Sequence, residues 1–382
     1  MNCRLAAALS AALLIPGTAF SSGLTLYGVV DTGLRYSHTA SEGTTADSLQ
    51  MMSGQNAGSR FGFKGGESLG SGWRVGFKLE NQFESDTGNE KGGRLFHRQS
   101  TADVSSPYGT VTFGRIGTFS SAAGTYDLFF GTGDAFDGGD GLITGPYSFD
   151  TRRNNTVTYE SPSAAGLTGY LQYSFSQGDE APHESGNERY LGAAAAYRRG
   201  ALNAVITAER VRYAAITGFG KREDKQVYGL AGSYDFGTFR LLGGLQYVTG
   251  ADNLAGLWLG KLADGSADYG RLSGAAVGLG AVIPLGKNKV EVMTGYASGR
   301  YGKEFAQAGE TYDLTGFSAA IRYHYVFSKR TEIYTGIGYQ QYKKDFDTAP
   351  GRKTRITQVA AGMTPQAKEI SPFRYINVSF NS

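Results

Sequence analysis

The residues best suited to form a functional site are concentrated in the long segment from Gly117 to Asn155. Its carboxylates are Asp127, Asp134, Asp137 and Asp140, and its aromatic residues are Tyr126, Phe129, Phe130 and Phe136. It ends in a basic pair, Arg152 and Arg153. A segment of this length without strand-like alternation is usually functional or disordered. Its aromatic residues argue against disorder. We therefore expect an ordered, functional loop.

Other kinds of site chemistry have weak support. The four histidines are His38, His97, His183 and His324, and no Gly-x-Ser-x-Gly elbow accompanies them. A nucleophile, a base and an orienting group within reach are therefore not evident. The acids after Gly133 lack the alternate-residue spacing of a calcium loop. The one cysteine, Cys3, excludes a disulfide framework and a cysteine-based metal site. We expect neither an enzyme nor a cofactor.

Composition favours many strands joined by tight turns. Of 382 residues 57 are glycine, and 24 tyrosines and 22 phenylalanines accompany only nine prolines. The formal charge is +3, or +2 without Arg4, because 36 basic residues would then oppose 34 acidic ones. Such a balance gives no case for nucleic acid as a partner.

The first nineteen residues have the features of an export signal. A positive start at Arg4 precedes an apolar core from Leu5 to Ile15, and small residues surround Ala19. We predict a signal peptide over 1–19 with cleavage before Phe20, and cleavage before Ser22 as the alternative. A membrane anchor is a weaker interpretation, because the apolar run is too short to span a bilayer.

The rest of the chain alternates apolar and polar residues with a period of two. In the stretch from Leu24 to Ser37 the apolar face carries Leu24, Leu26, Val30, Leu34 and Tyr36. Similar strands continue to the end, and short turns alternate with long loops between them. This asymmetry is typical of outer-membrane barrels, which have short periplasmic turns and long external loops. We count roughly sixteen strands of about ten residues each, and expect an all-β, antiparallel transmembrane barrel over residues 20–382. A soluble β-sandwich is the alternative.

Within such a barrel we expect the long loop, about 116–154, to fold back into the mouth and narrow it. An exposed surface loop is the alternative. Tyr126, Phe129 and Phe130 would then hold the loop against the wall.

Six short stretches of the chain carry a family resemblance by their order and spacing: Leu24–Gly28, Ser59–Gly65, Gly109–Arg115, Tyr126–Phe129, Asn154–Pro162 and Ser328–Thr331. With them the chain resembles the general porins of Gram-negative outer membranes, which are trimeric, sixteen-stranded diffusion channels. The resemblance covers nearly all of residues 20–382.

In that family the third loop enters the pore, and acids on it face arginines on the wall. Carried over by position, the wall arginines are Arg60, Arg98 and Arg152, with Arg115 and Arg35 as weaker candidates. The corresponding loop acids are Asp127, Asp134 and Asp137. The loop lacks the family's Pro-Glu-Phe-Gly turn, so these acids cannot be aligned individually.

The chain departs from the family at its end. Porins usually finish on a strand whose last residue is Phe, whereas here Pro365 interrupts the strand 355–364 and an atypical tail, 365–382, follows. Either 355–364 closes the barrel, or 372–380 does and Phe380 replaces the terminal Phe.

The resemblance implies an outer-membrane homotrimer that lets ions and small hydrophilic solutes diffuse passively. Apolar outer rows of the early and late strands would form the subunit contacts and face lipid. A substrate-specific channel, a non-conducting adhesin and an outer-membrane enzyme are the alternatives. The arginines favour anions.

Overall fold

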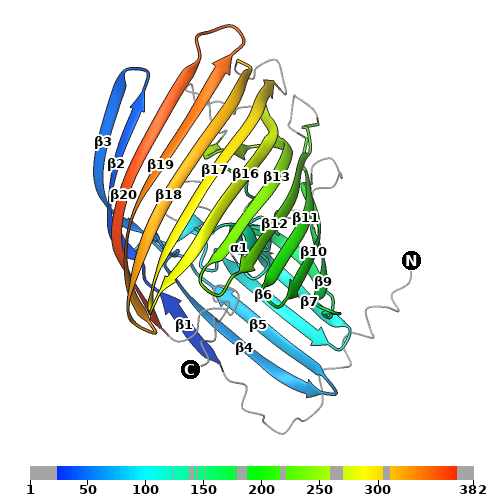
Figure 1. The fold of residues 1–382 in the computed structure, drawn as a ribbon. Helices are drawn as coiled ribbons and strands as arrows, with labels where there is room; N and C mark the ends of the chain where they lie inside the picture. The colour runs from blue at the N-terminus through cyan, green and yellow to red at the C-terminus, as the bar shows by residue number, and fades with distance from the viewer. Residues whose placement is uncertain are drawn as a thin grey trace.

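A computed structural model of the chain is an antiparallel β-barrel (Figure 1). The structure describes residues 24–122, 124–136, 142, 145–150, 152–175, 177–178, 187–215, 221–258, 270–303 and 310–367. The signal peptide predicted for 1–19 lies outside the described residues. Within these ranges no helix has the length and apolarity needed to cross a bilayer.

The main sheet contains eighteen strand segments. In the first half these are β1 Thr25–Val29, β2 Thr32–Ser41, β3 Thr44–Ser53, β4 Arg60–Gly70, β5 Trp73–Glu80, β6 Gln99–Ser106, β7 Gly109–Gly117, β8 Arg152–Glu160 and β9 Leu167–Ser174. In the second half they are β10 Arg189–Arg199, β11 Leu202–Arg212, β12 Lys225–Asp235, β13 Arg240–Ala251, β16 Gly270–Leu285, β17 Asn288–Lys303, β18 Tyr312–Ser328, β19 Thr331–Phe346 and β20 Arg352–Ala367. The remaining elements are the pair β14 Asn253–Leu254 and β15 Leu257–Trp258, the 3₁₀ turn η2 Lys91–Gly93 and the short helix α1 Phe129–Gly133.

Two of the barrel strands are each broken into two segments. β1 and β2 both pair with β20 on one side, while β4 and β3 pair with them on the other. The eighteen segments therefore form sixteen strands, as the sequence predicts. The stretch from Leu24 to Ser37, expected to be one strand, bends at Val30 and Asp31, and β3 had no predicted counterpart.

The carboxylate of Asp31 holds the two breaks together. It is fully buried and accepts hydrogen bonds from the backbone N–H of Gln55 at 2.9 Å and from the hydroxyls of Tyr334 at 2.9 Å and Thr364 at 2.7 Å. These donors belong to the 54–59 crossover between β3 and β4, to β19 and to β20. One carboxylate thus satisfies backbone groups that the bent strands leave without ladder partners.

β20 closes the barrel. It pairs with β19 from Arg352 to Pro365 and with β2 and β1 on its other edge. Pro365 does not end this strand, contrary to the sequence-based expectation. Its carbonyl accepts the N–H of Val30 at 3.1 Å, and the next N–H, of Gln366, bonds to Arg330 at 2.8 Å. The proline is tolerated because the ladder needs only an acceptor there. The alternative closing segment, 372–380, lies outside the described residues.

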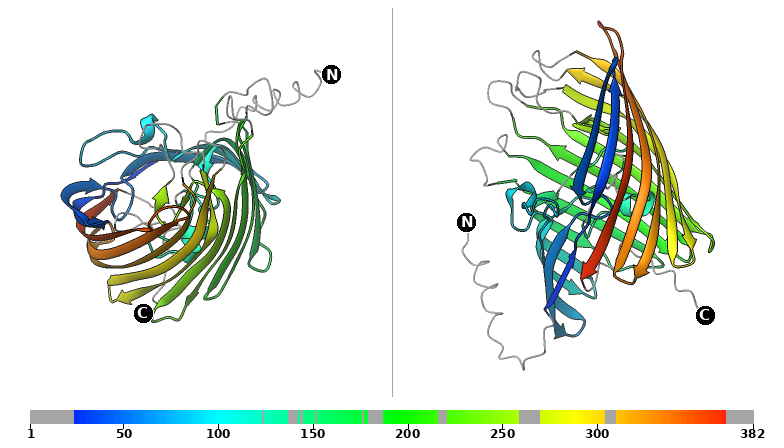
Figure 2. Two further views of the ribbon diagram at one scale, coloured as in Figure 1. Left: turned by 90° about the horizontal axis from the view of Figure 1, so that it is seen from above. Right: turned by 90° about the vertical axis from the view of Figure 1, so that its left-hand side faces the viewer.

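The strands separate an apolar outer face from a polar inner one. In β9, Leu167 and Leu171 are more than half exposed, whereas Thr168, Tyr170 and Gln172 are buried. Because successive side chains point to opposite faces, this pattern places leucine rows outside and polar groups inside. The two views in Figure 2 show the wall end-on and from the side of β2, β3 and β20.

Candidate pore-lining site

We call the segment between β7 and β8, residues 118–151, loop 3; its described residues include side chains that pack against the inner side of the barrel wall. Its helix α1 contacts β11, β12, β13 and β16, and Figure 1 shows α1 against these strands. Phe129 and Tyr147 are buried and meet edge to face with ring centroids 4.9 Å apart. The Tyr147 hydroxyl donates to the carbonyl of Gly244 at 3.0 Å. The aromatic residues fix the described part of the loop to the wall.

Glycines on the wall permit this close approach. A Cβ added at Gly278 would lie 2.4 Å from the Tyr147 hydroxyl, and one at Gly295 would lie 2.4 Å from Pro146. At Gly229 the nearest atom of the Phe129 ring would be 2.7 Å away. Real Cβ atoms do not occupy such distances. The loop therefore lies in a groove that missing side chains create on β12, β16 and β17.

A buried carboxylate, Glu80 at the end of β5, organises two of the predicted arginines. It accepts the Nε–H of Arg98 at 2.6 Å and the hydroxyl of Tyr27 at 2.7 Å, and the ammonium of Lys78 lies 3.4 Å away. Arg60 donates to the carbonyl of Gly58 at 2.8 Å, and a Cβ on Gly58 would be 3.1 Å from Arg98. Arg60 and Arg98 are thus brought together beside a carboxylate of the wall. They are largely buried, as is Glu80.

Two further predicted arginines lie next to His97, at the loop ends of β7 and β8. Arg115 donates to the carbonyl of His97 at 2.9 Å and to the side chain of Asn154 at 2.6 Å. Burial, followed by the positive charges of Arg152 and Arg115, lowers the pKa of His97 to about 4. Since Arg98 follows His97 directly, the four arginines form one continuous basic region along β4 to β8.

The other predicted residues are placed differently. Arg35 is on β2, and its guanidinium lies 3.6 Å from the sulfur of Met52 on β3. Asp127 is half-buried in the turn before α1. Asp137 lies outside the described residues, so its position stays a prediction.

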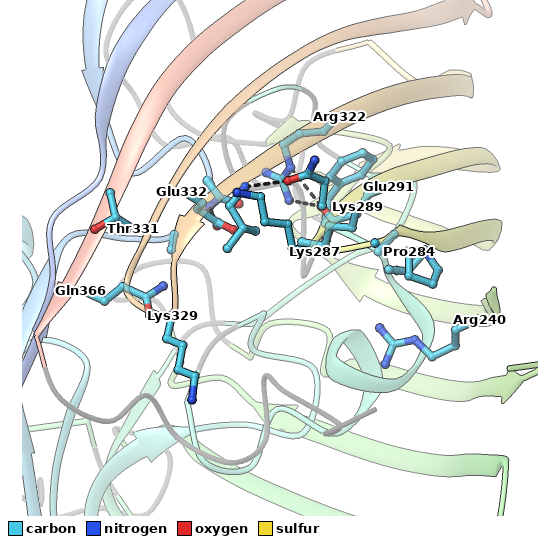
Figure 3. A pocket seen from close by; sticks show the side chains of 18 of the residues that line it. Arg240, Pro284, Lys287, Lys289, Glu291, Arg322, Lys329, Thr331, Glu332 and Gln366 are labelled. Carbon is cyan, nitrogen blue, oxygen red and sulfur yellow. Dashed lines mark hydrogen bonds and ion pairs between the residues drawn. The ribbon is translucent and has the colours of Figure 1, made fainter. Parts of the chain in front are cut away.

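Asp134 and Arg60 line the same cavity. The cavity has a volume of about 550 Å³ and extends from α1 to the short turns that follow β12, β16 and β18. Asp134 is buried and accepts the backbone N–H of Phe136 at 2.7 Å. A loop acid and a wall arginine therefore line one space inside the barrel, part of which is shown in Figure 3.

A second charged cluster, on β17, β18 and β19, meets loop 3 from the opposite wall. Glu291 accepts from Arg322 at 2.8 Å and lies 2.9 Å from the imidazole Nε2 of His324. The Arg322 guanidinium lies 4.7 Å from the centre of the Phe136 ring and donates to the carbonyl of Gln55 at 3.3 Å. Arg322 therefore connects loop 3 to the 54–59 crossover.

Sequence reasoning missed Glu80, Lys78, Glu291 and Arg322. Each lies on the inner face by strict alternation, for example Lys78 and Glu80 between the outward Phe77 and Leu79. Alternation could have nominated them as inner-face residues. It could not have shown that Glu80 pairs with Arg98 of the next strand.

The comparisons identify the family. A family model described as Gram-negative porin matches residues 6–345, so the chain belongs to that family. An outer membrane porin protein of Bordetella pertussis is 30% identical over 88% of this chain and 94% of its own length. Outer membrane porin protein 32 of Delftia acidovorans is 32% identical over 59% of this chain and 64% of its own length.

Solved structures have the same fold. An anion-selective porin from Comamonas acidovorans covers 91% of this chain and 100% of its own at 24% identity, with a TM-score of 0.68. An outer membrane channel of Acinetobacter baumannii covers 92% and 100% at 16% identity, with a TM-score of 0.59. The chain is an outer-membrane porin, a transmembrane β-barrel that serves transport. Family and fold point to a channel rather than an enzyme.

Proposed function

We propose that this porin is a passive diffusion channel for ions and small hydrophilic solutes, with a constriction between loop 3 and the basic wall. The observation that carries the proposal is the shared cavity of Asp134 on the loop and Arg60 on the wall. Charges act strongly on one another in a narrow, poorly screened space. Opposed charged side chains then set the ion preference.

The basic region favours anions. It contains Arg60, Arg98, Arg115 and Arg152, of which Arg98 forms an ion pair with Glu80. The solved porin from Comamonas acidovorans, which has the same fold, is named as anion-selective. Movement through such a pore needs no energy source, since solutes follow their gradients.

The assembly we propose is a homotrimer. Among the described residues β3 pairs only with β2, and its outward Leu49 and Met51 are 70% and 59% exposed. A strand edge of this kind needs to be covered. The wall is also lower on this side, because β5 to β9 have 8 or 9 residues each, whereas β16 to β20 have 16 or 17. Contact between subunits at β2 to β5 would cover both features.

The first test is a planar-bilayer measurement on refolded protein under a salt gradient. We expect stepwise openings grouped in threes and a reversal potential that reports anion preference. Arg60→Gln and Arg98→Gln should each lower the anion-to-cation permeability ratio several-fold, because each removes a positive charge from the inner wall.

The matched control is Lys353→Gln, which makes the same change of charge at an exposed position on β20. Its permeability ratio should equal that of the unmodified protein. Absence of conductance from correctly folded protein would overturn the pore. If the protein conducts but neither arginine variant alters the anion-to-cation permeability ratio, the proposed constriction is wrong.

A further inference from the structure

A groove on the outer face of the barrel has no part in the proposed pore. It has a volume of about 400 Å³ and lies across β11, β12, β13 and β16. The side chains that point outward into it are Ile206, Ala208, Tyr228, Leu230, Leu245, Tyr247 and Ala275, and each is exposed. Among the described residues none that lines it is charged. By alternation these side chains face the lipid side of the wall, so we call this feature the outer groove.

Two rows of side chains across the strands form the outer groove. The row nearer the long loops is, in order, Ala208, Tyr228, Tyr247 and Ala275. The row two residues closer to the short turns is Ile206, Leu230 and Leu245. Small alanine side chains at both ends of the first row leave space beside the large ones. An exposed apolar groove of this kind suits a hydrocarbon chain.

Arginines of the same outer face lie just beyond the groove, toward the long loops. Arg210 follows Ala208 by two residues in β11, about 7 Å along the strand, and its side chain is 58% exposed. Arg212 continues the outward row and lies opposite Arg189 of β10. These strand ends are external, because the short turns at the other ends of the strands face the periplasm.

Positive charge exceeds negative charge at this external end. Arg189, Arg210, Arg212 and Lys221 supply four positive charges, whereas Asp224 and the exposed Glu223 supply two negative ones. The remaining carboxylate nearby, Glu188, is paired with Arg153 of the inner face.

The pairing of Arg210 with Asp224 orders the guanidinium without using all of it. Nε donates to one carboxylate oxygen of Asp224 at 2.9 Å, and Nη2 donates to the same oxygen. A guanidinium has five N–H donors. Asp224 therefore leaves the Nη1 donors of an exposed, oriented arginine to another acceptor.

Tyr228 lies at the boundary between the groove and the arginines. Its ring lines the groove, and its hydroxyl donates to the side chain of Gln226 at 2.7 Å. Gln226 in turn lies opposite Arg210 in the sheet. Tyrosines of a membrane protein are enriched at headgroup level. Arg210 is thus at the depth of lipid headgroups, and the groove is at the depth of the acyl chains.

We propose that this face binds an acylated, phosphate-bearing glycolipid of the outer leaflet, with an acyl chain in the outer groove and a phosphate at Arg210. The planar fork of arginine suits phosphate, because it can donate two parallel hydrogen bonds. Basic clusters beside a membrane span attract anionic lipid headgroups. The inference goes beyond the proposed pore function, since the site lies outside the lumen.

The proposed trimer leaves this face open to lipid. Its subunits would meet at β2 to β5, and the left view of Figure 2 shows the green strands β11 to β13 on the other side of the barrel from β2 and β3. The glycolipid site and the subunit contact therefore do not compete.

The test is native mass spectrometry of the refolded protein in detergent, with three lipids as probes. They are lipid A with its phosphates, the same lipid with its phosphates removed, and phosphatidylglycerol. The phosphorylated lipid A should bind at lower concentration than the other two. Arg210→Gln should lower its bound fraction at least fivefold. Ala275→Phe should lower it as well, because the new ring fills the outer groove without changing the charge.

Two matched controls make the same changes elsewhere on the barrel. Lys353→Gln removes an exposed charge on β20, and Ala319→Phe adds a ring on β18 between the outward Phe317 and Ile321. Both should bind as the unmodified protein does, and every variant should keep its heat-dependent gel migration.

Three results would overturn the site. Equal binding of phosphatidylglycerol would show that the arginines select no glycolipid, and equal binding of the dephosphorylated lipid would remove the role of the phosphate. Unchanged binding in folded Ala275→Phe would show that the acyl chain lies elsewhere. Conductance is measured separately and should be the same in Arg210→Gln and the unmodified protein, so failure of the lipid site is distinguishable from failure of the pore.

Discussion

Glu80 is a single inner-face residue that changes the electrostatic environment of the arginines beside it. The loop acids alone were expected to oppose the arginines, yet the direct ion-pair partner of Arg98 is this wall carboxylate at 2.6 Å. A buried charge needs such a partner, because leaving water is costly. Glu80 therefore makes it possible to keep Arg60 and Arg98 close together in the lumen.

His97 gives a prediction for acid conditions. Its pKa is about 4 in the folded protein, below the ordinary value of about 6.5. The opened segment therefore binds a proton more readily than the folded one between these values, and stability falls as pH drops through this window. We expect segment 81–98 to open more easily at pH ~4.5 than at pH ~7.5, as measured by hydrogen exchange. The His97→Gln protein should lack most of this difference; an equal difference in both proteins would contradict the role of His97.

At the scale of elements, loop 3 and the wall are complementary surfaces. Aromatic side chains on the loop fit positions on the strands that have no side chain at all. Gly278 receives Tyr147 and Gly295 receives Pro146. The high glycine content of the chain thus has a specific use on the inner face, besides its use in turns.

This fit predicts the effect of adding one methyl group. In Gly295→Ala the new Cβ would lie 2.4 Å from Pro146, so loop 3 must shift. We expect a loss of roughly 1–3 kcal/mol of stability from overpacking, measured by urea unfolding in detergent, and noisier open-channel current. The control is Gly302→Ala in the same strand, where a Cβ meets no atom within 4 Å. Equal stability of the two variants would refute close packing at Gly295.

At the scale of the whole molecule, closure depends on strands from both ends of the chain. β20 pairs with β19 and, on its other edge, with β2 and β1. Asp31 and Thr364 connect the same ends at 2.7 Å. The barrel is therefore complete when Ala367 is in place.

A chain that ends after Ala367 should consequently refold and conduct. Each pair that closes the barrel is made by residues up to that position. Deletion of residues 368–382 should change neither the heat-dependent gel migration nor the unit conductance. Failure of the shortened chain to fold, alongside normal folding of the full chain, would show that closure needs the segment 372–380.

The sequence by itself determined the strands, the turns and the side to which each residue points. Alternation with a period of two is a local property, so it predicted the antiparallel barrel class as a whole. It did not predict β3 or the bend at Asp31, because there the backbone is held by side chains distant in sequence. Arg60, Arg98 and Asp134 were predicted from the family resemblance rather than from alternation.

Only the tertiary structure decided which of those side chains meet. The contact between Arg322 and Phe136 and the hydrogen bond from Tyr334 to Asp31 join segments that are distant in sequence. The stagger of the closed barrel and the docking of loop 3 set these distances. A local pattern fixes the direction of a side chain, whereas the partner at the end of that direction depends on how the whole wall curves and closes.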